Sequence, residues 1–213
     1  MKLLAIETSC DETAISILDF KSSKKFKILS DLVLSQIEIH KKYGGVYPAL
    51  AKREHISNLF PVFFQSLLNA KLIKKRKIKK VIKKNLLKKL KKIFNKDEHN
   101  LNLLLNFYKN YEMPKIKAIA VTYGPGLEIA LWTGFNFARS LALILKAELI
   151  PVNHMEGHIY ASLLEKENKN EFKIINPKLP ALALLISGGH TELQLIKKEY
   201  SYKLLGSTLD DAV

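Results

Sequence analysis

The chain has 213 residues, of which 47% are hydrophobic, with 35 lysines and arginines against 20 aspartates and glutamates. This length and apolar content are enough for one large or two modest hydrophobic cores. The single cysteine, Cys10, excludes a disulfide framework and fits a reduced compartment. No apolar stretch approaches the ~20 residues that span a bilayer, and the run at 3–6 is too short for a signal-peptide core. We expect a cytoplasmic protein with no membrane partner.

The net charge of +15 is concentrated in one segment. Residues 71–96 hold 14 basic residues and no acidic one, so the rest of the chain carries 21 basic and 20 acidic residues. Outside this segment the net charge is therefore +1. The sequence predicts a near-neutral globular protein with one lysine-rich tract, which is the name used below for residues 71–96.

The first part of the chain is predicted to contain three strands and then a helix. Runs of apolar residues with alternation indicate strands, and apolar residues at three- or four-residue spacing indicate a helix. The predicted elements are strands at 2–8, 13–20 and 26–35, a loop around Gly44, Gly45 and Pro48, and a helix at 49–70.

The lysine-rich tract follows this helix. Its apolar residues recur at helical spacing from Ile78 to Phe94, which predicts an amphipathic helix with a cationic face. Three interpretations stay open: a solvated surface insertion, contact with a nucleic-acid backbone, or contact with an anionic membrane surface. Phe94 is the only aromatic residue of the tract, so base stacking there is not expected.

The second part of the chain alternates strands and helices and then repeats the opening pattern. Asn153 is the expected N-cap of a helix that ends near residue 165. The predicted elements are a strand at 116–122, a sharp loop at 123–126, a helix at 128–146, a strand at 148–152, a helix at 153–165, a polar linker at 166–178, and strands at 179–186 and 191–196 around a turn. The restart indicates a duplicated α/β fold. We expect a first domain at 1–168, with the lysine-rich insertion at about 71–112, and an incomplete second domain at 169–213.

The segment Asn153–His158 is the strongest local signal for chemistry. His154 and His158 are four residues apart, so on a helix they share a face and can bind one metal ion. Two imidazoles leave the coordination incomplete, and the helix offers no obvious third ligand. The alternative is that both histidines serve capping or partner contacts. The metalloprotease pattern H-E-x-x-H is absent, since Met155 follows the first histidine.

Two turns of small polar residues, at 8–11 and 187–191, each follow an apolar strand. Their backbone N–H groups and hydroxyls suit a phosphate, and Asp11 or Glu12 can hold a cation or orient water. An ordinary hairpin turn is the alternative for each of them. The loop Gly124-Pro125-Gly126 before a helix also favours an anion, although a tight structural turn explains it equally well.

Read together, these motifs resemble those of the tRNA N6-threonylcarbamoyladenosine transferases, formerly described as O-sialoglycoprotein endopeptidases. The resemblance covers almost the whole chain outside the insertion and follows the family order. The matching segments are IETSCDET at 6–13, YGGVYPALAKREH at 43–55, VTYGPGL at 121–127, PVNHMEGHIYA at 151–161, LLISGGHTEL at 184–193 and LLGSTLDDA at 204–212.

The resemblance implies an α/β fold of the actin/hexokinase/Hsp70-like (ASKHA) type, with two duplicated domains and a nucleotide cleft between them. It implies transfer of the threonylcarbamoyl group from threonylcarbamoyl-adenylate to N6 of adenosine 37, in tRNAs that read codons beginning with A. It also implies one divalent metal, Fe²⁺ or Zn²⁺, and an adenylate or ATP in the cleft. By motif match, the metal ligands are His154 and His158, the substrate-binding segment is Leu185, Ile186, Ser187, Gly188 and Gly189, and the phosphate-side loop holds Ser9, Asp11 and Glu12.

The chain departs from the family pattern in two ways. Family members are well over a hundred residues longer, and their third metal ligand, an aspartate, belongs to the part that this chain lacks. We therefore expect the isolated chain to be inactive. The second departure is the basic insertion, where Lys74, Lys75, Arg76 and Lys77 are candidate tRNA contacts.

The resemblance also implies partners, and it leaves two other functions to weigh. The expected partners are tRNA, an ASKHA-like dimerisation partner and, in bacteria, an ATPase. The alternatives are a non-catalytic ASKHA-like scaffold, which has no reason to keep two facing imidazoles, and a metalloendopeptidase, which the missing H-E-x-x-H argues against.

Overall fold

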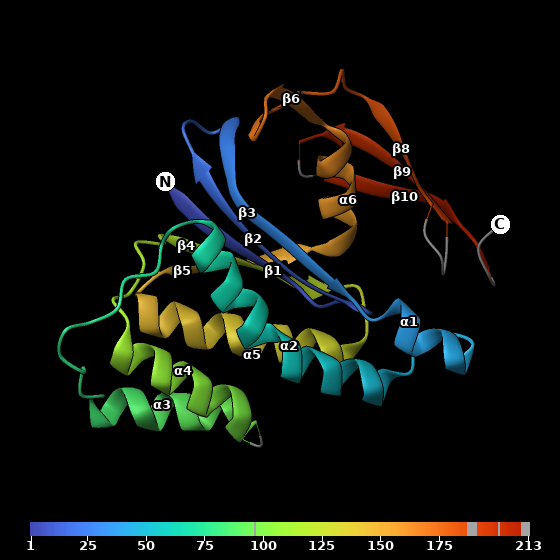
Figure 1. The fold of residues 1–213 in the computed structure, drawn as a ribbon. Coiled ribbons are helices and arrows are strands. Elements are labelled where there is room, and N and C mark those ends of the chain that lie inside the picture. Colours follow the sequence, from blue (N-terminus) through green and yellow to red (C-terminus); the bar gives the residue numbers. More distant parts are fainter. Residues whose placement is uncertain (96, 187–190, 200, 210–213) are drawn as a thin grey trace.

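The computed structural model describes residues 1–95, 97–186, 191–199 and 201–209 and shows a mixed α/β fold with two sheets (Figure 1). The larger sheet has the strand order β5-β4-β1-β2-β3-β7-β6, and the smaller has the order β10-β9-β8. The strands are β1 (Lys2–Glu7), β2 (Glu12–Phe20), β3 (Lys25–Ser35), β4 (Ala118–Gly124), β5 (Glu148–Asn153), β6 (Leu164–Asn168), β7 (Glu171–Ile174), β8 (Ala181–Ile186), β9 (Thr191–Lys198) and β10 (Ser201–Ser207). The helices are α1 (Ile37–His40), the 3-10 helix η1 (Lys41–Tyr43), α2 (Pro48–Asn69), α3 (Lys84–Phe94), α4 (Glu98–Asn110), α5 (Glu128–Leu145) and α6 (His154–Ser162).

The centre of the larger sheet follows from alternation of side chains along its strands. β1 pairs antiparallel with β2 and parallel with β4. Successive side chains point to opposite faces of a strand, so Leu4, Ile6, Ile15 and Ile17 share one face and are all buried. The three strands predicted at the start of the chain are confirmed.

Helices α2 and α5 cover this apolar face, and α3 and α4 form an outer layer beneath them (Figure 1). The buried ring of Phe63 in α2 joins the layers, because its centroid lies 5.4 Å from that of Phe107 in α4 and 5.8 Å from that of Phe137 in α5. Both ring pairs meet edge to face, an arrangement that aromatic quadrupoles favour. The core therefore lies on the helical side of the sheet.

The helix of the lysine-rich tract begins at Lys84, six residues later than predicted. The residues before it are bound to the end of α4 instead of to their own backbone. Arg76 N donates to Asn110 O at 2.8 Å, and Lys80 N donates to Lys109 O at 2.9 Å. These tertiary hydrogen bonds replace the i→i−4 bonds that a longer helix would need, which local spacing alone does not predict.

The predicted linker at 166–178 is wrong over much of its length. Helix α6 ends at Ser162, and the polar residues after it form β6 and β7, which extend the larger sheet beyond β3. The ring of Phe172 stacks on that of Phe26 at 6.0 Å. These residues form strands because β7 pairs with the otherwise open edge of β3. This contact joins distant parts of the chain, so local composition does not predict it. The larger sheet thus continues to Ile174, while the division of the chain at 168 stays a prediction.

The smaller sheet is an antiparallel meander, as β1, β2 and β3 are. Its buried residues Leu185 and Ile196 pack against Met155 and Ile159 of α6. Helix α6 lies on the face of the larger sheet that is opposite α2 and α5 (Figure 1). No helix among the described residues has the length and apolarity to cross a membrane.

Candidate functional site

The site is built around the first turn of α6, which follows directly from the end of β5. Asn153 caps this helix as predicted: its Oδ1 accepts hydrogen bonds from the backbone N–H groups of Met155 (2.8 Å) and Glu156 (3.2 Å). The cap fixes where the helix starts and so places His154 and His158 one turn apart. Their Nε2 atoms are 3.1 Å from each other. The spacing of the two histidines thus produces a converging pair.

The separation of these nitrogens fits a shared metal ion. With Zn–N bonds of about 2.0–2.1 Å, two ligands of a tetrahedral site are about 3.3–3.4 Å apart. Two lone pairs that face each other at 3.1 Å also repel unless a proton or a cation lies between them. The described residues contain no cluster of three or more histidines, cysteines or acidic residues that could hold a metal. The described residues therefore offer a converging pair of imidazoles without a third candidate ligand beside them.

Glu7, which the sequence analysis did not single out, holds His154 in place. Its Oε2 lies 3.2 Å from His154 Nδ1 and also accepts a hydrogen bond from the Thr122 hydroxyl, while its Oε1 accepts one from the Ser9 backbone N–H. Burial raises the pKa of Glu7, but the hydrogen bonds from His154, Ser9 and Thr122 outweigh it and lower the pKa to about 2. The hydrogen bond to Glu7 raises the pKa of His154 in turn. The sequence did offer one sign of a special role for Glu7, because a carboxylate at the end of the otherwise apolar strand β1 is unusual.

Glu7 therefore sets which nitrogen of His154 faces outward. When Nδ1–H donates to the carboxylate, the Nε2 lone pair is free to point toward His158. Replacing Glu7 with glutamine keeps the size of the side chain but removes its charge. We expect Glu7→Gln to weaken metal binding about 10- to 100-fold, as loss of a ligand's carboxylate partner does in other metal sites. Competition with a chromogenic chelator measures this, and Glu98→Gln on exposed α4 is the control; equal affinities in both variants would contradict it.

Two loops that the sequence analysis treated separately lie against each other. Leu127 N donates to Ser9 O at 2.7 Å, and the Thr8 hydroxyl donates to Ala130 O at 3.0 Å. The approach is close enough to require glycine at Gly126, where φ is +150° and an added Cβ would be 2.6 Å from Ser9 O. The Ser9 loop is thus fixed from one side by the start of α5.

A buried network of polar side chains fixes the same loop from the other side. His55 Nε2 lies 3.0 Å from Cys10 O, while its Nδ1 lies 2.8 Å from the Thr13 hydroxyl and 3.4 Å from Gln36 Nε2. His40 Nε2 contacts Gln36 Oε1 at 3.0 Å. Every contact is satisfied when both imidazoles are neutral and carry their proton on Nε2. Burial lowers the pKa of His55, although the Cys10 carbonyl opposes this.

The lowered pKa of His55 predicts loss of stability in acid. The unfolded chain takes up a proton near the ordinary pKa of 6.5, whereas the folded chain resists it to a lower pH. The contribution of His55 is therefore complete above pH 6.5 and is lost as the pH falls through that value toward the folded-state pKa. Urea unfolding at pH 7.5 and pH 5.0 should show a smaller pH effect in His55→Gln than in the unaltered chain. Exposed His99→Gln serves as the control, and a pH effect that His55→Gln leaves unchanged would refute the assignment.

The other predicted residues fall into three groups. Asp11 O accepts from Gln36 N at 2.8 Å, which places Asp11 in the Ser9 loop, and Glu12 is exposed at the start of β2. The side chain of Leu185 packs against α6, and Ile186 is exposed at the end of β8. The predicted residues Ser187, Gly188 and Gly189 lie outside the described residues.

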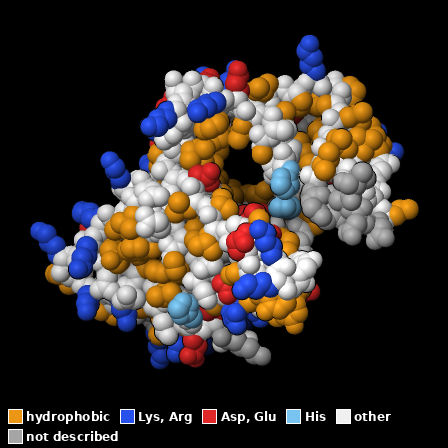
Figure 2. Space-filling model, turned by 45° about the vertical axis from the view of Figure 1, so that its right-hand side comes forward, with side chains coloured by type: hydrophobic (Ala, Val, Ile, Leu, Met, Phe, Trp, Pro, Cys, Tyr) orange, Lys and Arg blue, Asp and Glu red, His pale blue; other side chains and the backbone are white. Residues whose placement is uncertain are grey.

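The face of the larger sheet beside Glu7 is hollowed. Small side chains of β1, β2 and β4 leave a depression of ≈ 170 Å³, lined by Ala5, Glu7, Ala14, Ser16 and Thr122 among others. Figure 2 shows a hollow between the two sheets with histidine side chains at its rim. Of the residues around the histidine pair, Glu7 and Thr122 line this depression.

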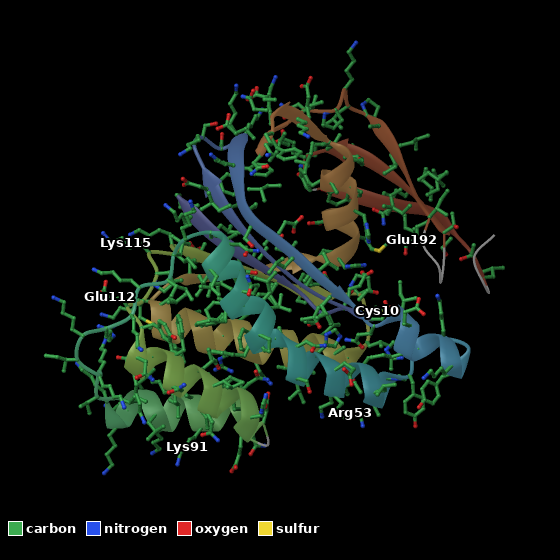
Figure 3. All side chains as sticks on the ribbon, viewed as in Figure 1. Cys10, Arg53, Lys91, Glu112, Lys115 and Glu192 are labelled. Carbon is green, nitrogen blue, oxygen red and sulfur yellow. The ribbon has the colours of Figure 1, made fainter. Side chains whose placement is uncertain are left out.

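The candidate tRNA contacts lie elsewhere. Lys74, Lys75, Arg76 and Lys77 connect α2 to α3 on the helical side of the sheet, and Lys74 forms an ion pair with Glu112 at 3.2 Å. In Figure 3, Glu112 lies far from Cys10, which marks the Ser9 loop. The structure does not bring these basic residues to the histidines.

Comparison with known proteins identifies the family. The profile of TsaD, tRNA N6-adenosine threonylcarbamoyltransferase, matches residues 27–82 and 102–213. The chain belongs to this family. It is 38% identical to the tRNA N6-adenosine threonylcarbamoyltransferase of Carboxydothermus hydrogenoformans over 210 residues, which are 99% of the chain and 47% of the relative. The relative from Thermosipho melanesiensis is 40% identical over 212 residues, 100% of the chain and 49% of the relative.

The chain thus spans about half the length of the curated relatives that it matches. Among solved structures, YeaZ from Pseudomonas aeruginosa aligns with a TM-score of 0.43 at 13% identity, over 99% of this chain and 69% of YeaZ. The PPX-GPPA enzyme of Aquifex aeolicus aligns with a TM-score of 0.36 at 12% identity, over 98% of this chain and 51% of that enzyme.

Proposed function

We propose that the protein containing this chain transfers a threonylcarbamoyl group from threonylcarbamoyl-adenylate to N6 of adenosine 37, in tRNAs that read codons beginning with A. Membership of the tRNA N6-adenosine threonylcarbamoyltransferase family carries the proposal. In this reaction N6 attacks the carbamoyl carbon, a C–N bond forms, and the C–O bond to the adenylate phosphate breaks. AMP leaves with the bonding electrons, and the N6 amine loses a proton.

The residues of the site have separate tasks in this proposal. His154 and His158 would hold one divalent metal, Fe²⁺ or Zn²⁺, which acts when bound as a Lewis acid toward the substrate. Glu7 keeps the Nε2 atom of His154 available, as its contact with Nδ1 indicates. Ser9, Asp11 and Glu12 would lie on the phosphate side of the adenylate, since their loop adjoins the hollow.

We also propose that the chain holds the two domains of a duplicated ASKHA fold, divided near residue 168, with β7 (Glu171–Ile174) still pairing with the sheet of the first domain. The matching antiparallel meanders β1-β2-β3 and β8-β9-β10 support this. The adenylate, or ATP, would bind between them and contact the segment 185–189, of which Leu185 and Ile186 end β8. The expected protein partners are an ASKHA-like dimerisation subunit and an ATPase, and the expected location is the cytoplasm.

A complementation experiment tests this function. The complete reading frame that contains the chain is expressed in bacteria depleted of their own transferase, and digested tRNA is analysed by liquid chromatography and mass spectrometry. We expect threonylcarbamoyladenosine to return. Expression of residues 1–213 alone should not restore it, because the described residues supply two metal ligands. Folded, metal-loaded protein that restores no modification would overturn the proposal.

A further inference from the structure

The lysine-rich tract has no role in the function proposed above. In α3 it presents five exposed lysines, called here the cationic helix face: Lys84, Lys88, Lys89, Lys91 and Lys92. Among the described residues, the ion pair of Lys74 with Glu112 is the one that involves the tract, and no carboxylate pairs with the cationic helix face. This charge is therefore not neutralised within the described part of the molecule.

The charge of this face does not help α3 to fold. Lys84 and Lys88, and Lys88 and Lys92, are four residues apart, and like charges at this spacing destabilise a helix. The first turn also has no acidic residue to interact with the helix dipole. Burial of Leu90 and Phe94 holds the helix in place instead. Lys91 and Lys92 lie in the last turn, where a cation favours the helix dipole, but repulsion along the face opposes this gain, so folding of α3 does not by itself account for five lysines.

The packing of α3 argues against a membrane as its partner. A helix that binds a membrane surface inserts its apolar face among the lipids. The apolar face of α3 is already used, since it packs against α4 and α5 in the main core. The exposed apolar residues of the tract are Ile78 and Val81, which lie in the loop before α3. What α3 offers to a partner is charge.

This helix is an addition to the family pattern, and it packs against α5 in the outer helical layer. The family profile stops at residue 82 and resumes at 102, so α3 lies in the unmatched interval. A groove of ≈ 330 Å³ runs from Asn95, at the end of α3, to Ile129 and the half-exposed Trp132 in the first turns of α5. The loop before α5 is the one that contacts Ser9. The groove therefore connects the end of α3 with the start of α5, and Asp97 is the acidic residue in its lining.

We propose that the cationic helix face binds the phosphate backbone of RNA, as an auxiliary contact for the tRNA substrate. That the RNA is a tRNA rests on the proposed function. The unpaired charge of α3 and the packing of its apolar face in the core are independent of that function. Such contacts neutralise phosphates without reading sequence, and each contributes about one to the slope of log affinity against log salt. The proposed surface is thus defined by its salt dependence.

The test uses the protein containing this chain, an unmodified tRNA transcript and fluorescence anisotropy at several salt concentrations. The variant Lys88→Gln/Lys91→Gln/Lys92→Gln keeps helix-forming side chains and removes three charges. Its matched control is Lys24→Gln/Lys27→Gln/Lys166→Gln. This variant removes three exposed charges that form no ion pair with the described residues, from β3, β6 and the turn before β3. We expect the slope to become shallower by about 2 to 3 in the first variant and to stay unchanged in the control.

Two further measurements separate the possible outcomes. Equal slopes in both triple variants would overturn the proposal. So would a protein that binds phosphatidylserine vesicles, if the α3 variant lost this binding but kept its binding to tRNA. Modification assays run in parallel keep the two proposals apart. If the α3 variant has a shallower slope but the unaltered protein forms no threonylcarbamoyladenosine, the surface is supported and the proposed function is contradicted. If the unaltered protein modifies tRNA fully but the α3 variant has an unchanged slope, the proposed function is supported and the surface is contradicted.

Discussion

Replacing His154 with alanine should remove both the bound metal and the formation of threonylcarbamoyladenosine. The substitution deletes one of two converging Nε2 atoms that are 3.1 Å apart, and it leaves Glu7 without its imidazole partner. Loss of an outer-shell partner already weakens metal sites about 10- to 100-fold, so loss of a ligand should lower affinity at least a hundredfold. Metal analysis of the purified protein and mass spectrometry of tRNA nucleosides measure the two effects.

His99→Ala is the matched control, because His99 is exposed on α4 in the outer helical layer. It should keep the metal content and the modification level of the unaltered protein. A circular dichroism spectrum and a melting temperature for each variant exclude simple unfolding. If His154→Ala retained both its metal and its activity, the histidine pair would not be the metal site.

Replacing Gly126 with alanine should separate the two loops of the site. The new Cβ would lie 2.6 Å from Ser9 O, a contact with backbone that cannot rotate away, at a φ of +150° that side chains rarely adopt. Forced contacts of this kind cost about 1–3 kcal/mol. Because small misplacements of reacting groups can cost about a hundredfold in rate, we expect modification to fall roughly 10- to 100-fold.

Gly206→Ala controls for the loss of a glycine, since a Cβ at Gly206 meets nothing within 4 Å. Denaturation should show a stability loss in Gly126→Ala and almost none in Gly206→Ala. Metal content shows whether the displacement of Ser9 reaches the histidines, because Ser9 Oγ lies 3.3 Å from His154 Nδ1. Equal stability and equal modification in the two variants would show that the close approach to Ser9 is unimportant.

The elements that local patterning fixes were predictable from the sequence. The alternation of Leu4 and Ile6 located β1, and the helical spacing after Glu128 located α5. Asn153 correctly placed the start of α6, which put the two histidines on one face. In each case the information lies within a few residues of the element, which is the range over which periodicity and capping act.

The features that the sequence did not reveal depend on contacts between distant residues. The late start of α3 follows from backbone bonds to Asn110 and Lys109, and β7 forms because β3 offers an open edge. Glu7 is joined to His154 across 147 positions of the chain. The resemblance to the family named the histidines but not this carboxylate, which only the geometry of the fold brings beside them.

The placement of α6 has a mechanical consequence. The helix is fixed at its start to the end of β5, while Met155 and Ile159 attach its apolar side to the smaller sheet. A shift of one sheet relative to the other must therefore tilt α6 or break its apolar contacts. His158, one turn farther from the fixed end, would travel farther than His154. Because both imidazoles belong to the same helix, a tilt would leave their mutual separation unchanged and alter instead the distance from His154 to Glu7, which lies on β1.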